Sequence, residues 1–272
     1  VLMETTEVSF TAKDVMSLRQ KTGLGMMDCK RALSECGGDM TAAEQWLRKE
    51  LKGKLQQRSE RATGEGRIAV AIKGSDATII EIRSETDFTA RNESFRAMTD
   101  DLATMALAQP AGPVQPDTAM TARVDDVRLT TKENLVIARG EKLQGGSFGQ
   151  YVHHDGKRAA LVQIDGAADE QVLTGICQHI VAHVPAPIGV SEQDVPAETL
   201  DQIRNDAMQE ATDAGKPPEI VQKIADGKVR KYLQDNTLLN QKYVRDDTKT
   251  IKQLLPPGVT ITRFVRYTVG AE

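Results

Sequence analysis

Residues 145–149 (GGSFG) match the pattern G-x-S-x-G, in which a glycine-flanked serine is the nucleophile of many hydrolases. That arrangement needs a strand before the serine and a helix directly after it, because the helix N-terminus helps to stabilise the oxyanion. Here residues 150–155 (QYVHHD) follow, and they are typical of a strand and a turn. We therefore interpret the segment as a glycine-rich loop and keep a hydrolase acting through Ser147 as an alternative function.

Two pairs of histidines have spacings that a metal site could use. His179 and His183 lie four positions apart on an expected helix, as in helical zinc sites. Ile180 stands where H-E-x-x-H has glutamate and no third ligand is near, so we expect one imidazole in the core and one at the surface. His153 and His154 are neighbours on an expected strand, where adjacent side chains point to opposite faces. We predict no metal site and no cofactor.

Nucleotide-binding motifs are also incomplete. Residues 64–66 (GEG) begin a run similar to G-x-G-x-x-A, but the run precedes an expected strand instead of joining a strand to a helix. The chain has no phosphate-binding loop of the G-x-x-x-x-G-K-S/T type. Because no catalytic constellation emerges, we expect a protein that acts by contact with a partner and not as an enzyme.

The composition narrows the classes of protein further. The chain has 272 residues, with 35 Lys and Arg against 39 Asp and Glu and a formal net charge of -4. This balance does not favour non-specific nucleic-acid binding, which needs a basic surface. No apolar run approaches the ~20 residues of a membrane span, and the first ten residues lack the features of a signal peptide. Three cysteines without a C-x-x-C pair indicate a reducing compartment, so we expect a cytoplasmic protein.

Residues 11–52 are predicted to form a module of three short helices. Thr11 and Asp14 have the spacing of a capping box, and Gly23 is a typical helix end. A second helix is expected from about residue 26 to residue 36, and Asp39 can cap the third. Residues 53–67 are basic and poor in apolar side chains, which indicates a solvated linker, with nucleic-acid contact as a weaker alternative.

A β-β-α pattern then occurs twice, which predicts an α+β core of two related antiparallel subdomains over residues 68–145 and 146–190. In the first copy two alternating strands precede an amphipathic helix, and residues 133–143 could supply a further strand. In the second copy two strands precede a helix that ends before Pro185. The apolar positions expected to line these two helices are Phe95, Met98, Leu102 and Met105, and Val172, Ile176, Ile180 and Val184.

Residues 191–235 are predicted to form a protruding antiparallel helical hairpin, or short coiled coil. Gly215 can end its first helix and Pro217 can begin the second. The apolar stripes expected between the helices are narrow: Leu200, Ile203, Ala207 and Ala211 on one, and Ile220, Val221, Ile224, Val229 and Tyr232 on the other. The last segment, residues 236–272, contains the alternating run VTITRFVRYTV, which we expect to return to the core as a strand.

Two segments resemble the signatures of the bacterial and organellar translation elongation factor Ts family. They are residues 18–33 (LRQKTGLGMMDCKRAL) and residues 81–95 (EIRSETDFTARNESF). The resemblance continues through Tyr151 and His153, the GKP of residues 215–217 and the closing TRFVRYTVG. It implies a ubiquitin-associated-like three-helix module, a two-subdomain core and an inserted coiled coil. It also implies guanine-nucleotide exchange on elongation factor Tu, the GTPase that delivers aminoacyl-tRNA.

The resemblance also implies which residues meet the GTPase. Asp87 and Phe88 would insert between its helices near the Mg²⁺ site, with Thr86 and Thr89 in the same loop. Without the resemblance, a lone phenylalanine at this position is more often a half-buried packing residue, and an exposed wedge is the alternative. The contacts implied elsewhere are Arg19, Met26, Met27 and Lys30 in the module, and His153, Tyr243 and Val244 in the core.

Some positions depart from the family pattern. Thr89 stands where the family often has Val, and Lys242 where Pro is common, which leaves the contact near Tyr243 and Val244 open. A three-helix scaffold that binds some other partner remains the third function to weigh, beside the exchange factor and the hydrolase.

Overall fold

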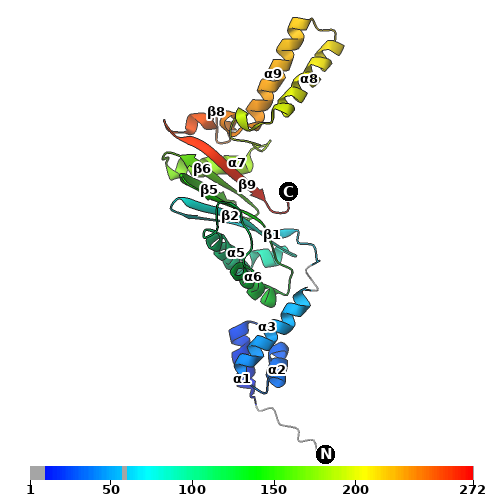
Figure 1. Ribbon diagram of the computed structural model, residues 1–272, viewed down its shortest axis with the longest axis vertical. Coiled ribbons are helices and arrows are strands. Elements are labelled where there is room, and N and C mark those ends of the chain that lie inside the picture. The colour runs from blue at the N-terminus through cyan, green and yellow to red at the C-terminus, as the bar shows by residue number, and fades with distance from the viewer. Residues whose placement is uncertain (1–9, 57–59, 272) are drawn as a thin grey trace, which may run out of the picture.

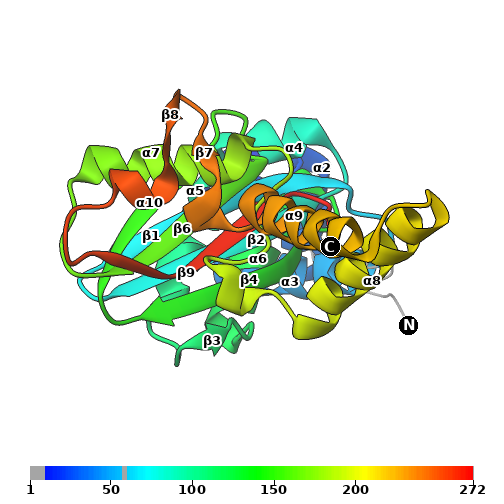
Figure 2. The ribbon, with the colours of Figure 1, turned by 90° about the horizontal axis from the view of Figure 1, so that it is seen from above.

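The computed structural model describes residues 10–56 and 60–271, and it has three parts along one long axis (Figure 1). A three-helix module lies at one end, a two-sheet core in the middle, and a helical hairpin projects from the other end. Viewed from above, the hairpin extends away to one side of the core (Figure 2). This arrangement agrees with the α+β architecture predicted from the sequence.

The module contains α1 (Ala12–Thr22), α2 (Met26–Glu35) and α3 (Met40–Gln56). Its predicted caps are confirmed: Thr11 and Asp14 form a capping box, Gly23 ends α1 with φ 70°, and the Asp39 carboxylate accepts from two N–H groups of the first turn of α3. The module has its own small core, formed by Val15, Leu18, Leu24, Cys29, Ala32, Leu33, Ala43 and Leu47.

The boundaries of the expected linker, residues 53–67, need correction. Helix α3 continues to Gln56, and strand β1 (Glu65–Lys73) begins inside the same range. Residues 49–56 are mostly Lys, Glu, Leu and Gln, which favour helix even where they are too polar to indicate packing. Of the described part of the range, only residues 60–64 lie outside a helix or strand.

The first sheet has the strand order β1-β2-β4-β3, all antiparallel, and adds β2 (Asp76–Ser84), β4 (Val136–Gln144) and β3 (Gly112–Pro113). Its outer face is covered by α5 (Glu93–Ala106) and α6 (Thr118–Thr131). The strand expected within residues 133–143 is β4. Helix α6 has no counterpart in the sequence prediction, although Met120, Val124 and Val127 are buried along it. It follows the proline-rich residues 108–117 (AQPAGPVQPD), whose composition is more typical of a connection than of a helix start.

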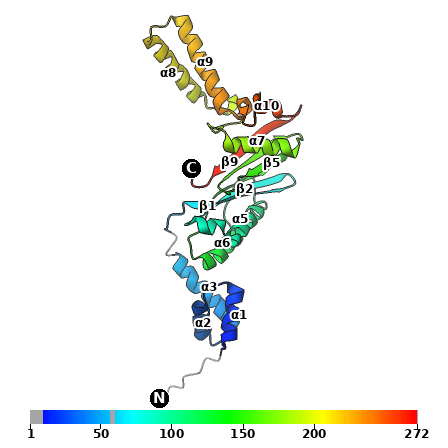
Figure 3. The same cartoon turned by 180° about the vertical axis from the view of Figure 1, so that it is seen from behind.

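Helix α6 also attaches the module to the core. It lies between the first sheet and α3 (Figure 3), and Arg48 of α3 forms an ion pair with Asp126 of α6 at 3.2 Å. Leu129, on the same helix, packs against the core of the module. A single helix therefore contacts both parts.

The second sheet has the order β5-β6-β9, with β5 (Ser147–Val152), β6 (Arg158–Asp165) and β9 (Thr260–Thr268). Helix α7 (Glu170–Ala182) covers its outer face, so the predicted β-β-α repeat and the returning C-terminal strand are both confirmed. Val184 does not line α7 as expected. It follows the end of the helix and is 90% exposed.

The two sheets pack face to face with their helices outside (Figure 1). Alternation along the strands produces this arrangement: Ile79 faces the second sheet, whereas Ile80 faces α5 and α6. In the same way Leu161 faces the first sheet and Val162 faces α7. Strands β2 and β6 are therefore buried on both faces.

A buried carboxylate ties the two sheets together. Glu81 of β2 has no exposed surface, and its oxygens lie 2.7 Å from the guanidinium nitrogens of both Arg83 and Arg139. It also accepts from the backbone N–H of Gly270, beyond β9, while Arg139 donates to the carbonyl of Thr268. Each of its two carboxylate oxygens therefore faces an arginine, which offsets the cost of burying this side chain.

The hairpin consists of α8 (Ala197–Asp213) and α9 (Pro218–Asn236), preceded by the short helix η1 (Glu192–Asp194). Gly215 follows α8 with φ 69°, as predicted. The interior stripe of α9 is Val221, Ala225, Val229 and Leu233, against Ala207 and Ala211 of α8. Ile220, expected in the interior, is 40% exposed. The chain then returns through η2 (Leu238–Asn240), β7 (Lys242–Tyr243), β8 (Asp246–Thr250) and α10 (Ile251–Leu254) to β9.

Candidate functional site

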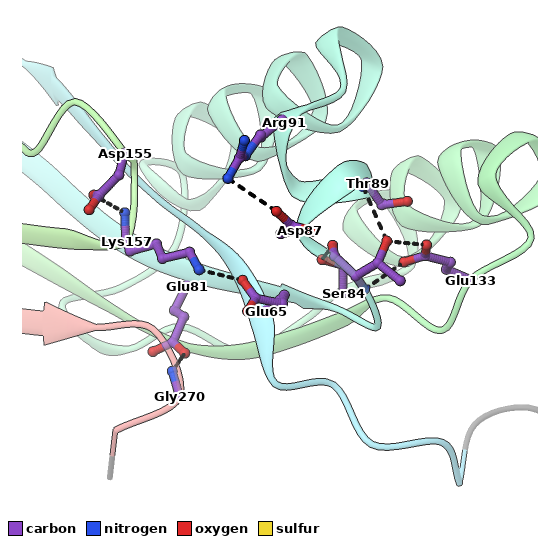
Figure 4. A network of polar contacts seen from close by, with 11 residues as sticks. Glu65, Glu81, Ser84, Asp87, Thr89, Arg91, Glu133, Asp155, Lys157 and Gly270 are labelled. Atoms are coloured by element: carbon purple, nitrogen blue, oxygen red, sulfur yellow. Dashed lines mark hydrogen bonds and ion pairs between the residues drawn. The ribbon is translucent and has the colours of Figure 1, made fainter.

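Residues 86–89, expected as a loop, form the cap and first turn of the short helix α4 (Asp87–Arg91). The Thr86 hydroxyl accepts from the N–H of Thr89 at 3.3 Å, which satisfies one of the free donors at the helix start. Asp87 lies in the first turn and pairs with Arg91 at 3.1 Å, as drawn in Figure 4. The segment is thus a regular turn of helix with a local cap.

Helix α4 has a buried face toward the core and an exposed face toward solvent. Ala90 is buried in the core of the first subdomain, and Thr89 is 8% exposed. Phe88, between the cap and this buried pair, is 83% exposed. The structure therefore decides a question that the sequence left open: Phe88 is an exposed aromatic on an anchored helix, not a packing residue.

A distant segment fixes the cap of α4. Glu133 lies just after α6, and its carboxylate accepts from the Thr86 hydroxyl at 2.6 Å and from the Thr86 N–H at 3.1 Å (Figure 4). The Ser84 hydroxyl donates to the Thr86 carbonyl at 3.0 Å. The next residue, Asn134, donates its N–H to Glu85 at 2.7 Å. Residues 84–86 are therefore held from both sides.

The residue before Glu133 connects to the module. Lys132 ends α6 in the left-handed conformation with φ 59°, and its ammonium lies 3.5 Å from the carboxylate of Asp28 in the first turn of α2. In that turn Met26 is 48% and Met27 is 74% exposed, whereas Cys29 is buried. Lys132 thus contacts α2, which carries the exposed methionines, and the next residue, Glu133, contacts the cap of α4, which carries Phe88.

The other residues implied in the module are exposed as well. Arg19 of α1 and Lys30 of α2 both have exposed side chains. A methionine pair at a helix start would ordinarily place one side chain in the core. Here the apolar contacts of α2 are made by Cys29, Ala32 and Leu33, which leaves both methionines outside.

His153 lies in the turn between β5 and β6, and the Tyr151 hydroxyl is 2.9 Å from its Nδ1. The prediction that His153 and His154 point apart is wrong, since their ring centres are 4.3 Å apart. Strand β5 ends at Val152, so strand alternation does not extend to the two histidines. The turn is tied to the first sheet by the N–H of Ile68, which donates to the carbonyl of Gly156 at 2.9 Å.

The same turn carries Asp155. Burial opposes the ionised form of this carboxyl, but the Lys157 N–H and the charges of His153 and Arg158 outweigh it, so that the pKa of Asp155 lies below its ordinary value. A cleft of about 350 Å³ lies between this turn and α4.

Tyr243 and Val244 are positioned by a buried histidine. Nε2 of His179, on α7, lies 2.9 Å from the side-chain amide oxygen Oε1 of Gln241, and its Nδ1 accepts from the N–H of Val244 at 3.3 Å. Nε2 therefore carries the proton. Burial lowers the pKa of His179 to about 4, with His183 adding to this effect and Gln241 opposing it. As expected, His179 lies in the core and His183 is partly exposed.

The structure contradicts the hydrolase alternative at Ser147. This residue begins β5, so a strand follows it where a nucleophilic serine needs a helix. Within residues 10–56 and 60–271, no three His, Cys, Asp or Glu side chains gather as metal ligands. Over the same residues no helix is both long and apolar enough to cross a membrane.

Residues 85–271 match the family model described as "Elongation factor TS", which covers well over half of the chain. The chain belongs to the elongation factor Ts family. Residues 2–54 match a second model, "Elongation factor Ts, mitochondrial, N-terminal". The chain is also 37% identical over 276 residues to a protein named "Elongation factor Ts" from Thioalkalivibrio sulfidiphilus (strain HL-EbGR7), covering 97% of this chain and 93% of that relative.

The two elongation factor Ts signatures have definite places in the fold. Residues 18–33 form the end of α1, the turn at Gly23 and most of α2, whereas residues 81–95 form the end of β2, α4 and the start of α5. Each signature includes an exposed apolar side chain next to a helix start. Sequence reasoning missed Glu133, which holds the cap of α4 from elsewhere in the chain. It expected a core imidazole from the pair His179 and His183, but it missed the contacts of His179 with Gln241 and Val244.

Proposed function

We propose that this member of the elongation factor Ts family is a guanine-nucleotide exchange factor for elongation factor Tu. In this proposal Asp87 and Phe88 insert between helices of the GTPase, near its Mg²⁺ and nucleotide site, and GDP is released. The observation that carries the proposal is the 83% exposure of Phe88 on a capped and anchored helix. An exposed phenylalanine offers a large apolar area at a low entropic cost, since few bonds must be immobilised.

The anchoring of α4 supports insertion by a preformed element. Thr86 caps the helix, Glu133 fixes the cap and Ala90 is buried beneath it. A wedge on a fixed helix loses little conformational freedom on binding, so more of its contact energy is available to displace helices of the partner. Nucleotide affinity in such GTPases depends on Mg²⁺ and the phosphate-binding backbone, and displacement of those helices weakens both.

Two further surfaces complete the proposed interface. Arg19, Met26, Met27 and Lys30 form the first, in the three-helix module. His153, Tyr243 and Val244 form the second, in the core. Methionine is an adaptable interface side chain, which suits the exposed pair on α2.

The proposed mechanism is a coupling between two ligands of the GTPase. If the factor and the nucleotide each weaken the binding of the other, the effect is reciprocal, so that GDP leaves and incoming GTP expels the factor. The chain would supply no covalent chemistry and no cofactor, and GDP and GTP would be bound by the partner. The cellular excess of GTP over GDP would drive the exchange toward the GTP-bound form of the partner. The proposal places the chain in the cytoplasm with the translation machinery.

The test is the rate of release of fluorescently labelled GDP from purified elongation factor Tu, with excess unlabelled GDP, with and without the full chain. We expect the rate to increase with the concentration of the chain and to saturate. Release at the intrinsic rate at every concentration would contradict the exchange function. Pull-down of a different protein and not of the GTPase would favour the three-helix scaffold instead.

A further inference from the structure

The cleft of about 350 Å³ between α4 and the turn after β5 is lined mainly by charged side chains. The basic ones come from four elements: Arg67 from β1, Arg91 from α4, Arg96 from α5 and Lys157 from the turn. We call this site the arginine cleft. It lies directly beside the helix that presents Phe88, and Asp87 belongs to its lining.

Two of these cations are already neutralised. Arg91 pairs with Asp87 at 3.1 Å, and Lys157 pairs with Glu65, both drawn in Figure 4. Asp155, also in the lining, lies 3.6 Å from Arg158. These pairs leave little excess charge on the residues that form them.

Arg67 and Arg96 are different. In the part of the chain that the structure describes, neither guanidinium forms an ion pair. The Nε of Arg67 is buried and has no hydrogen-bond partner. A buried donor without a partner costs free energy, so the Arg67 guanidinium is not fully satisfied by the described residues.

Arg67 is also fixed in place. A Cβ on Gly156 would lie 2.5 Å from its Nη1, so the guanidinium packs directly over the turn at a position where φ is +73°. Only glycine combines that backbone conformation with that closeness. The guanidinium is therefore held at the wall of the cleft before any ligand arrives, while Arg96 is exposed at its rim.

We propose that the arginine cleft receives a carboxylate side chain of the partner protein, beside the place where Phe88 inserts. This inference rests on the proposed function and specifies the chemistry that the partner must present. The planar guanidinium group of arginine can bind a carboxylate through two parallel hydrogen bonds. Arg67 and Arg96, which form no ion pair among the described residues, supply positive charge for one such carboxylate. Asp87 and Asp155 stand among the cations and repel a polyanion, which disfavours a nucleic-acid backbone or an oligophosphate.

The experiment measures the dissociation constant of the complex between the full chain and nucleotide-free elongation factor Tu, at salt concentrations from 50 to 300 mM. Over this range the Debye length shortens through ~10 Å, so a charge–charge contact at an exposed site becomes increasingly screened. The variants are Arg96→Glu and Arg96→Gln in the full chain. Among residues 10–56 and 60–271 Arg96 has no ion pair to lose, so these variants should keep the fold. Lys73→Glu is the matched control, because Lys73 is exposed at the opposite end of β1 and its substitution changes the net charge equally.

We expect Arg96→Glu to weaken binding by roughly 10-fold at the lowest salt and to flatten the salt dependence, with a smaller effect for Arg96→Gln. Lys73→Glu should stay within about 2-fold of the parent. A charge-swap series on the partner, Asp or Glu to Lys, should contain one substitution that restores binding to Arg96→Glu but not to the parent.

Unchanged affinity and salt dependence in Arg96→Glu, with a parent that still accelerates GDP release from elongation factor Tu, would overturn the arginine cleft proposal and leave the exchange function intact. If the parent neither binds elongation factor Tu nor accelerates its release of GDP, the exchange function itself is refuted. Binding of an RNA oligonucleotide to the free chain that depends on Arg96, with unchanged partner affinity, would assign the cleft to nucleic acid and also overturn the proposal.

Discussion

The carboxylate of Glu133 accepts two hydrogen bonds from Thr86, one from its hydroxyl at 2.6 Å and one from its backbone N–H at 3.1 Å. These residues are 47 positions apart, and Thr86 is the cap of the helix that presents Phe88. The orientation of the exposed aromatic therefore depends on a residue that follows α6. Since Lys132, the preceding residue, contacts Asp28 of the module, one short segment stabilises two of the proposed partner-binding surfaces.

Removal of the Glu133 carboxylate should loosen α4 and slow nucleotide exchange. We expect Glu133→Ala to lower the free energy of unfolding by about 1–2 kcal/mol, because two donors of Thr86 lose a charged acceptor at a partly exposed site. GDP release should slow several-fold at a concentration where the protein remains folded. Glu133→Gln keeps one acceptor oxygen and should be intermediate. Equal exchange rates in the parent and Glu133→Ala would refute the positioning role.

Phe88 should matter for exchange and hardly at all for folding. It is 83% exposed, so Phe88→Ala should change the free energy of unfolding by less than about 0.5 kcal/mol. If it fills a pocket in the partner, exchange efficiency should fall by roughly 30-fold, the effect of an interface hot spot near 2 kcal/mol. Met16→Ala, at a 62% exposed position on α1, is the control and should retain parental exchange. Parental exchange in Phe88→Ala would remove the wedge but not the exchange function.

His179 should make stability depend on pH between about 6.5 and 4. Burial lowers its pKa in the folded state to about 4, whereas the unfolded chain titrates near the ordinary value of 6.5. Between these values the unfolded state binds more protons, so acidification favours unfolding, by at most about 1.4 kcal/mol per pH unit. Urea unfolding at pH 7, 6 and 5 measures this slope. His179→Gln should show a shallower slope, and an identical slope in the two proteins would contradict the assignment.

Two glycines offer a matched test of packing between β5 and α7. A Cβ on Gly149 would lie 2.5 Å from the Cβ of Leu173, with the α7 backbone close behind, so Gly149→Ala should destabilise the fold by roughly 1–3 kcal/mol. Gly227 lies in the middle of α9 with nothing within 4 Å of its Cβ position. Gly227→Ala should therefore stabilise the protein, by up to about 1 kcal/mol. Thermal unfolding of both variants decides this, and a stabilising Gly149→Ala would contradict the packing described.

The sequence alone determined the features that depend on near neighbours. The capping box at Thr11, the left-handed helix ends at Gly23 and Gly215 and the alternating strands were all predicted correctly, because their hydrogen bonds and periodicities involve residues only a few positions apart. The two signatures likewise identified the family from contiguous residues. Where a local signal was weak, as in the proline-flanked α6, the element itself was missed.

Only the tertiary structure decided what each face meets. Alternation along β2 showed that two faces exist, but not that one meets the second sheet and the other meets α5 and α6. It could not show that Phe88 is exposed, that Glu133 holds its helix, or that Arg67 and Arg96 line one cleft. These relationships depend on the packing of segments far apart in the chain, and that packing is set by the burial of the whole apolar surface and not by any local pattern.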